Sequence, residues 1–426
     1  MWLAEVGGTR VLTDPLLTGT FHDGVFRVHP ARSIDLAALR PDLIVVSHRH
    51  PDHFDVPSLK MLACSDPTTL VLTADPFVGK TCQELGFEHV GVLNPWDKVP
   101  LEGATLLTTP SLCDVVEWGM VFATNDGTVW NQVDTVLRDG PTVRSVWDRV
   151  STTLGCASEP SMLIAQWQPL REIEPHVYGR VDFPVTALAK ALERCSVLAS
   201  DLLVLGASGH HHIGPASWLN AHAYPVSEAR FVRDLALRSP SLRCDVVVPG
   251  RMWHVAGGAV TRVGENHPAV SLQTTPDGRA WRPDGIPPLV GTGSEDDRAL
   301  VHAWVEQVLS AAIQPRLQSH LTAVLQLEVV WPEHEDTWSW TSDSPVATRS
   351  SVSEWDVRER VAGGALARVL RGESPWGAAL LSGQLRRVTR PSADGTSPTG
   401  RSFFLYDALS YDRSFERWTA HLVAQG

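Results

Sequence analysis

The segment that most constrains the fold of this chain is a short apolar run followed at once by a cluster of histidines. Leu43-Ile44-Val45-Val46 precedes Ser47-His48-Arg49-His50-Pro51-Asp52-His53-Phe54-Asp55. A continuous apolar run bounded by turn-forming residues is typical of a strand that is buried on both faces. In open α/β sheets, ligands bind beyond the carboxyl ends of such strands. The sequence therefore predicts a layered α/β fold with a functional loop directly after this strand.

Strand-like and helix-like segments alternate through the first two-thirds of the chain. Period-two or continuous apolar patterns predict strands, and apolar residues at helical spacing predict helices. The expected strands cover 9–13, 43–46, 69–73, 104–108, 119–123, 128–133, 202–205 and 245–248. The expected helices cover 56–62, 79–85 and 187–192. Such alternation indicates sheets that are covered by helices.

The loop after the buried strand carries four side chains of the kinds that hold zinc or iron. They are His48, His50, Asp52 and His53, and imidazole and carboxylate groups are usual ligands of these metals. In an extended loop, side chains two residues apart point the same way, so His48 and His50 can share one metal. Asp52 and His53 can then face a second metal at the turn. The alternative is a solvated polar loop in which Asp52 caps the following helix.

The His-x-His-x-Asp-His spacing of this loop resembles the signature of the metallo-β-lactamase fold. Two further segments carry the same resemblance: Thr13-Asp14-Pro15-Leu16-Leu17 resembles an early strand end of the family, and 126–135 resembles a later strand. The resemblance implies a four-layered αβ/βα sandwich. It also implies that Asp14 supports the metal ligands and that Asp134 bridges two metal ions.

A later segment, 220–228, resembles a His-x-x-Pro-x-x-Glu element of the branch that includes N-acylphosphatidylethanolamine phospholipases and ascorbate-phosphate lactonases. This resemblance makes His222 a candidate ligand. The amino-acid sequence of 47–55, together with Ser208-Gly209 and Pro249-Gly250, is most similar to the metallo-β-lactamase-like part of nucleotide-sugar N-acyl hydroxylases. Those enzymes also carry a Rieske domain, which requires Cys-x-His and Cys-x-x-His pairs. Neither pair occurs in this sequence.

The sequence departs from the family pattern at two ligand positions. The family has a His between the signature and the bridging Asp, but 109–119 contains none. Cys113 or Asp114 could replace it, and a buried structural thiol is the alternative role for Cys113. Where the family places its last His, the chain reads Val248-Pro249-Gly250-Arg251, and His254 follows a few residues late.

A run of three histidines, His210-His211-His212, follows the expected strand at 202–205. Adjacent residues on a loop point in different directions, so at most two of the three can reach one metal. Metal ligation, substrate contact and plain exposure are all left open for this run.

Composition excludes several classes of protein. The formal net charge of −12 argues against binding to bulk nucleic acid, and a hydrophobic content of 43% excludes a wholly disordered chain. No apolar run approaches the ~20 residues that span a bilayer, and residues 1–8 lack the pattern of a secretory signal. The six cysteines form no Cys-x-x-Cys pair. We therefore expect a cytoplasmic protein that acts on a small molecule, with an oligomeric state that the sequence leaves open.

A segment rich in Pro, Gly, Thr and Ser, 283–294, predicts a domain boundary. We expect a metallo-β-lactamase-like domain at 1–288 and a smaller α+β domain at 289–426. In the latter, the patterns predict helices at 300–313, 355–370 and 414–423 and strands at 324–331, 338–341 and 384–388. This order resembles the sterol-carrier-like domains appended to some alkyl sulfatases, which implies binding of an apolar part of a substrate. The alternative is that the second domain packs on the first and stabilises it.

The leading hypothesis is a hydrolase whose one or two divalent ions, zinc or iron, activate water and polarise an ester, amide or phosphoester bond. In this hypothesis His48 and His50 hold the first metal, Asp52 and His53 the second, and Asp134 bridges them. Asp52 is also the candidate catalytic residue, because it could orient the attacking hydroxide or carry its proton. A second hypothesis is a non-haem di-iron oxygenase, favoured if 113–117 supplies a carboxylate. A third is a degenerate binding module without turnover.

Overall fold

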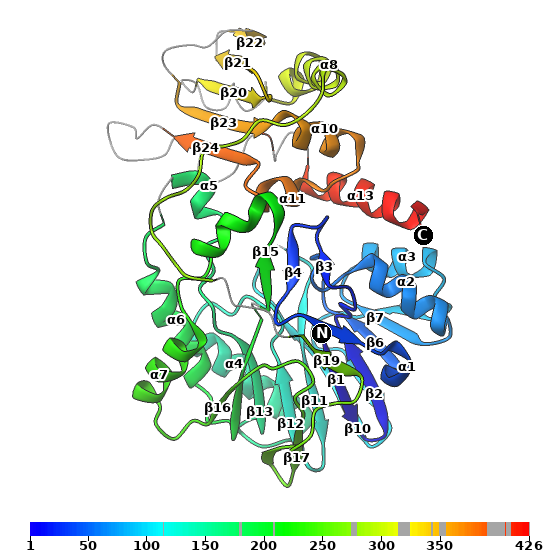
Figure 1. The fold of residues 1–426 in the computed structure, drawn as a ribbon. Coiled ribbons are helices and arrows are strands. Elements are labelled where there is room, and N and C mark those ends of the chain that lie inside the picture. The colour runs from blue at the N-terminus through cyan, green and yellow to red at the C-terminus, as the bar shows by residue number, and fades with distance from the viewer. Residues whose placement is uncertain are drawn as a thin grey trace.

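The structure is a computed structural model of the 426-residue chain. It describes residues 1–113, 115–178, 181–207, 209–273, 279–313, 324–341, 344–348, 355–389, 405 and 410–425. Two large sheets form the lower part of the molecule as drawn in Figure 1, and a further five-stranded sheet from the C-terminal part lies above them. The mixed α/β class predicted from the sequence is confirmed.

The first large sheet has the strand order β1-β2-β6-β7-β8. Its first two strands form an antiparallel hairpin, and the other neighbours are parallel. The central strand β6 is buried along its whole length, as its uninterrupted apolar run predicts. The strands are β1 (Trp2–Val6), β2 (Thr9–Thr13), β6 (Leu43–Val46), β7 (Leu70–Thr73) and β8 (Val90–Val92).

The second large sheet has the order β16-β14-β13-β12-β11-β10-β9. Strands β9 to β12 pair antiparallel, whereas β12, β13, β14 and β16 pair parallel. The strands are β9 (Lys98–Leu101), β10 (Ala104–Pro110), β11 (Trp118–Thr124), β12 (Gly127–Asn131), β13 (Met162–Gln166), β14 (Leu202–Gly206) and β16 (Cys244–Val246).

Helices accompany both sheets, on opposite sides of the molecule in Figure 1. Those that pack on the first sheet are α1 (Leu36–Leu39), α2 (Val56–Ser65) and α3 (Pro76–Glu84). Those that pack on the second are α4 (Gly140–Leu154), α6 (Val185–Ser196) and α7 (Glu228–Arg238). The short helix α5 (Glu174–Tyr178) contacts the C-terminal sheet, and the 3-10 segment η1 (Gly214–Ala221) contacts residues 210–212. The sequence patterns missed α4, whose apolar face is interrupted by polar residues over 15 positions.

The three largest apolar clusters among the described residues of this part lie between its layers. One joins the two sheets and includes Val45 of the first and Met120 of the second. A second lies between the first sheet and its helices, and a third lies between the second sheet and α4, α6 and α7. Burial of apolar surface in several such layers is the main stabilising contribution in a protein of this size. The arrangement is compatible with the expected αβ/βα sandwich.

Three further groups of short strands complete this part of the chain. β3 (Thr20–Phe21), β4 (Phe26–Val28) and β15 (His210–His212) form a small antiparallel sheet. β5 (Arg32–Ile34) pairs with β19 (Val270–Leu272), and β17 (Trp253–Ala256) pairs with β18 (Ala259–Arg262).

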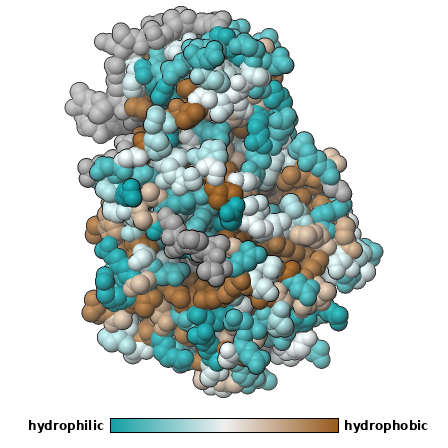
Figure 2. Space-filling model, in the orientation of Figure 1, coloured by the Kyte–Doolittle hydropathy of each residue, from teal (hydrophilic) through white to brown (hydrophobic). Residues whose placement is uncertain are grey.

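The C-terminal part contains the sheet β22-β21-β20-β23-β24. Its strands are β20 (Leu325–Val330), β21 (Glu335–Thr341), β22 (Ser344–Thr348), β23 (Val357–Ala362) and β24 (Leu385–Thr389). Its helices are α8 (Glu295–Trp304), the π-helical η2 (Val305–Leu309), α10 (Gly363–Arg371), α11 (Trp376–Leu381) and α13 (Tyr411–Gln425). On the face shown in Figure 2, hydrophilic residues dominate the surface near α8, and hydrophobic residues form a band across the lower half.

One predicted helix, 355–370, is wrong over its first half. Val357–Ala362 is instead strand β23, which pairs parallel with β20 and antiparallel with β24, and the helix begins only at Gly363. Val357, Glu359 and Val361 are buried while Arg358 and Arg360 are half-buried, which is the two-residue alternation of a strand. The tryptophan before the segment and the apolar residues after it had suggested helical spacing.

The C-terminal part has its own apolar cluster, which extends from α8 and η2 across β20, β21 and β23 to α10 and α11. Its last helix, α13, is not part of this cluster. It packs against α2, one of the helices that cover the first sheet. The domain boundary near residue 288 stays a prediction. Among the described helices, none has the length and apolar character needed to cross a membrane.

Candidate metal centre

The histidine loop runs from the end of β6 to the start of α2. The backbone N–H groups of His53 and Phe54 both donate to the carbonyl oxygen of His50, at 2.9 and 2.8 Å. This turn brings His53 back beside His48, with ring centroids 4.2 Å apart. The loop is thus folded back on itself, whereas the side-chain alternation used in the sequence argument assumed an extended loop. Asp55, and not Asp52, caps α2, since its carboxylate accepts from the backbone N–H of Ser58 at 3.1 Å.

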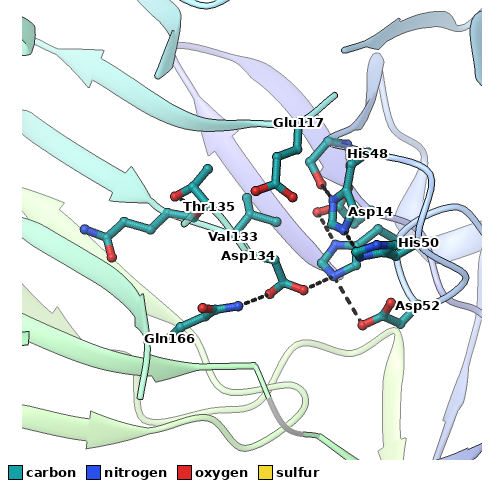
Figure 3. Close-up of polar contacts among 12 residues, drawn as sticks. Asp14, His48, His50, Asp52, Glu117, Val133, Asp134, Thr135 and Gln166 are labelled. Carbon is teal, nitrogen blue, oxygen red and sulfur yellow. Dashed lines mark hydrogen bonds and ion pairs between the residues drawn. The ribbon is translucent and has the colours of Figure 1, made fainter. Parts of the chain in front are cut away.

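Two groups of potential metal donors meet at this loop. The first is His48, His50 and Asp134, and the second is Asp52, His53 and Asp134; within each group the donor atoms lie within 4.8 Å of one another. In the first group, Nε2 of His48 is 2.9 Å from Nδ1 of His50. In the second, Nε2 of His53 lies 3.1 Å from Oδ2 of Asp134 and 3.2 Å from Oδ2 of Asp52 (Figure 3). Asp134 is shared by the two groups.

Polar neighbours fix the ring orientations of two histidines. Asp14, which is 2% exposed, has its Oδ2 3.0 Å from Nδ1 of His53, while its Oδ1 accepts from the backbone N–H of Ser47 at 2.7 Å. The Ser47 hydroxyl lies 2.9 Å from Nδ1 of His48. In both rings Nδ1 is thereby engaged and Nε2 is directed at the other donors. Such partners hold a ring in position and select the nitrogen that binds a metal.

Asp134 reaches the loop from the second sheet, just beyond the end of β12. The chain leaves the strand at Asn131, and Val133 adopts a left-handed conformation with φ of 53°. The side-chain oxygen of Asn131 accepts from the N–H of Val133 at 3.0 Å. Gln166, at the end of the neighbouring strand β13, donates from Nε2 to Oδ1 of Asp134 at 2.9 Å. The tight turn and the amide together aim the other carboxylate oxygen at His53.

The electrostatics of the two groups differ. Burial, together with His53 and His50, lowers the pKa of His48 to about 3. Burial acts in the same direction on His53, but Asp52, Asp134 and Asp14 raise the pKa of His53 well above its ordinary value. His48 is therefore neutral at pH 7, the state in which an imidazole binds a metal. The carboxylates around His53 supply the negative charge that attracts a cation.

Glu117 is a further carboxylate drawn near this centre in Figure 3, although it belongs to neither donor group found within the described ranges. It directly precedes β11, is 8% exposed, and extends into the space between His48 and Asp134 in Figure 3. Its Oε1 accepts from the Ser111 hydroxyl and from the Cys113 thiol, the latter at 3.0 Å. The sequence indicated it only as one of the two carboxylates of 113–117, within the segment in which the family's His is missing.

Cys113 and Asp114 are the two residues that could replace the missing His. Cys113 belongs to neither donor group found within the described ranges, and its thiol contacts Glu117 and the carbonyl of Val115. Burial raises the pKa of the Cys113 thiol, which disfavours the thiolate that binds metals. Asp114 lies outside the described residues.

His222 and His254 are also absent from the donor groups identified in the described part of the chain. Nδ1 of His222 donates to the carbonyl oxygen of Arg282 at 2.8 Å, and its ring packs 5.6 Å from that of Trp218. His254 is exposed on β17, opposite Thr261 of β18. That His222 and His254 are metal ligands stays a prediction, and the contacts of their side chains do not support it.

The run His210–His212 forms β15 and lines a second polar cluster. Nε2 of His210 is 3.3 Å from Oε1 of Glu172, and Nε2 of His212 is 3.8 Å from the same oxygen. His211 instead stacks on His29, with centroids 3.9 Å apart. Burial would raise the pKa of Glu172, but His210 and His212 lower it. No pattern in the sequence pointed to Glu172.

The donor set at the loop fits one or two divalent transition metals. Two imidazoles with one carboxylate, beside one imidazole with two carboxylates, are ligand types that suit zinc, iron or manganese. His48 is buried, and Asp134 belongs to both groups. Zinc and iron are equally compatible with these donors.

Comparisons with known proteins agree with this geometry. A family model described as a beta-lactamase superfamily domain matches residues 1–138. A UPF0173 metal-dependent hydrolase of Exiguobacterium sp. (strain ATCC BAA-1283 / AT1b) is 26% identical over 144 residues, which are 31% of this chain and 58% of that relative. The match thus spans a little over half of the relative's length.

Several solved structures are similar to this chain at low identity. They include an isothiocyanate hydrolase from Delia radicum gut bacteria (18% identity, 60% of this chain and 95% of that one, TM-score 0.41). A second is CmlA, a diiron beta-hydroxylase from Streptomyces venezuelae (18%, 61% and 52%, TM-score 0.40). A third is the metallo-beta-lactamase fold protein YhfI from Bacillus subtilis (14%, 53% and 79%, TM-score 0.35).

The family match over residues 1–138 includes the whole His48–His53 loop, Asp14 and Asp134. These are the residues that the structure gathers into two donor groups and their supporting contacts. Residues 1–138 of this chain are therefore similar to the beta-lactamase superfamily domain over the stretch that carries these donors.

Proposed function

We propose that this chain is a metal-dependent hydrolase that holds one or two divalent ions at the His48–His53 loop and acts on a small molecule. The observation that carries the proposal is the position of Asp134, whose carboxylate belongs to both donor groups. A carboxylate shared between two such groups is suited to bridge neighbouring ions, as in two-metal hydrolytic sites.

His48 and His50 would hold one ion, Asp52 and His53 a second, and Asp134 would face both. A divalent ion in such a site lowers the pKa of water and polarises the bond to be cleaved. The protein's part is to hold the donors in place, which Asp14, Ser47 and Gln166 do through the contacts described above. Asp52 is the most exposed of the carboxylates around His53, with 38% of its side chain exposed against 24% for Asp134. We assign Asp52 to orient the attacking water and to accept its proton.

A second candidate function, a non-haem di-iron oxygenase, is supported by Glu117. A carboxylate placed where the family has an imidazole shifts the donor set toward oxygen ligands, which suit iron or manganese more than zinc. Cys113 and Ser111 hydrogen-bond to one oxygen of Glu117, so its other oxygen is the candidate donor.

Elemental analysis is the first test, on protein purified without chelators or a nickel column. About one or two equivalents of zinc, with hydrolysis of an ester, amide or phosphoester panel that a chelator abolishes, are expected for the hydrolase. Iron with reductant-dependent oxygen consumption and no hydrolysis would transfer support to the oxygenase. A protein that takes up neither metal, even after incubation with an excess of each, would contradict both the hydrolase and the oxygenase. It would favour the third hypothesis, a binding module without turnover.

A further inference from the structure

The loop that carries the metal donors is contacted from outside by the C-terminal helix α13. Arg49 lies between His48 and His50, and its guanidinium bridges two carboxylates. Nε contacts Asp75, the N-cap residue of α3, which is fully buried. Nη1 donates to Oδ1 of Asp412 at 3.0 Å. The second partner comes from α13, 363 residues further along the chain.

An aromatic contact joins the other end of the loop to the same helix. Phe54 follows His53 directly and is 2% exposed. Its ring centroid lies 6.4 Å from that of Phe415 in α13, and Phe77 of α3 is 6.2 Å from Phe415. Phe415 is 1% exposed and belongs to the apolar cluster beneath β6. The helix α13 therefore contacts the loop at two positions, one between the first two histidines and one directly after the third.

The C-terminal part also contacts the turn between β3 and β4. Asp23, in the turn between β3 and β4, pairs with Arg368 of α10 at 2.9 Å and accepts from the Ser374 hydroxyl at 2.7 Å. Its neighbour His22 packs against Trp418 of α13, with centroids 6.4 Å apart. Contacts from residues 368–418 thus reach two separate elements at the site.

We propose that α13 positions the metal-binding loop, with Asp412 and Phe415 acting through Arg49 and Phe54; the proposal rests on the assigned metal site. Metal affinity depends on how firmly the donors are held before the ion arrives, and outer contacts that fix donors are part of that rigidity. The guanidinium of Arg49 is held by Asp75 and Asp412, and this anchoring restrains the backbone between the two histidines. A contact of Arg49 with α13 therefore restricts the His48–His50 pair directly.

The test compares Asp412→Asn with a matched control, Asp148→Asn. The Asp412 side chain is 66% exposed and that of Asp148 is 62% exposed, and each pairs with an arginine, but Asp148 lies on α4 with its partner Arg144 4.0 Å away. Zinc affinity is measured by competition with a chromophoric chelator. Exposed pairs contribute little, so Asp412→Asn is expected to weaken zinc binding by about three- to fivefold, with no change in Asp148→Asn.

A double-mutant cycle with Arg49→Gln separates positioning from a general loss of stability. If Asp412 acts through Arg49, Asp412→Asn causes no further loss of zinc affinity in the Arg49→Gln background. Equal losses in both backgrounds would overturn the proposal, as would an Asp412→Asn variant with the affinity of the parent protein.

Hydrogen exchange of the backbone amides in 47–55, measured on metal-free protein, tests whether α13 positions the loop, independently of metal binding. We expect faster exchange in Asp412→Asn and in Phe415→Leu than in the parent and in Asp148→Asn. If the parent protein binds no zinc or iron, the proposed function fails, while the exchange result still supports or overturns the role of α13. Unchanged exchange in both α13 variants would overturn it.

Discussion

Asp14 and His53 are 39 residues apart in the sequence, yet Oδ2 of Asp14 lies 3.0 Å from Nδ1 of His53. The other oxygen of Asp14 accepts from the N–H of Ser47. One buried carboxylate therefore fixes both the start of the loop and the direction of a ring near its end. This makes Asp14 a positioning group for the whole donor set.

Replacing Asp14 with Asn should weaken metal binding by about 10–100-fold, the usual cost of losing an outer partner of a ligating histidine. The amide can still accept from Ser47 but carries no charge toward His53. Zinc affinity by chelator competition measures the effect. Asp42→Asn is the control, because Asp42 accepts from the N–H of Arg10 on the neighbouring strand and does not contact the loop donors. Equal affinities for the two variants would contradict this role.

Replacing His48 and His50 together with Ala should abolish metal binding in the first donor group and reduce the total metal content to that of the second group or less. The two ring nitrogens face each other at 2.9 Å, and Asp134 is the remaining member of their group. The control replaces the exposed His89 with Ala. Metal content by elemental analysis decides the outcome, and parental content in the double variant would show that the site is misassigned.

The sequence predicted the part of the site that lies close together in the chain. His48, His50, Asp52 and His53 follow one buried strand, so their proximity needs no knowledge of the rest of the fold. Asp134 was available only through a family resemblance, because its approach depends on the turn at Val133 and on the packing of the two sheets.

Glu117 was indicated only as one of the two carboxylates of 113–117, and Glu172 and Asp412 were not indicated at all. Glu172 and Asp412 are single carboxylates with no motif around them. Tertiary packing alone brings Glu172 to the histidines of β15 and Asp412 to the loop. The misassigned 355–370 segment has the same origin. Its strand half is stabilised by pairing with β20 and β24, which are distant in the chain.

Glu117 separates the two proposed activities. Glu117→Ala should lower metal affinity by about tenfold if Glu117 is a donor, since it removes one ligand and leaves a cavity near His48. Glu117→His should retain zinc and lower the ratio of bound iron to zinc, because imidazole favours zinc more than carboxylate does. Competition between the two metals, followed by elemental analysis, measures this ratio. A Glu117→Ala variant with parental affinity would place Glu117 outside the donor set.

His176, which lies away from the metal centre, should make the free energy of unfolding depend on pH. His176 of α5 is 2% exposed, and Nη1 of Arg386 in β24 donates to its Nδ1 at 3.1 Å. Burial and the charge of Arg386 lower the pKa of His176 to about 3. The folded protein therefore keeps His176 neutral at pH values where the unfolded chain, with an ordinary pKa near 6.5, takes up a proton.

Because the unfolded state binds the extra proton, stability falls as the pH drops below about 6.5 and continues to fall until the pKa of the folded state is reached. Between pH 7 and pH 5, His176 should account for a loss of about 2 kcal/mol in the free energy of unfolding. His176→Asn removes the titrating group and keeps an acceptor for Arg386, so its stability should fall less over this interval. Urea unfolding at both pH values measures the difference, and His89→Asn, at an exposed position, serves as the control. If His176→Asn and the parent protein lose the same free energy between pH 7 and pH 5, His176 is not buried in its neutral form.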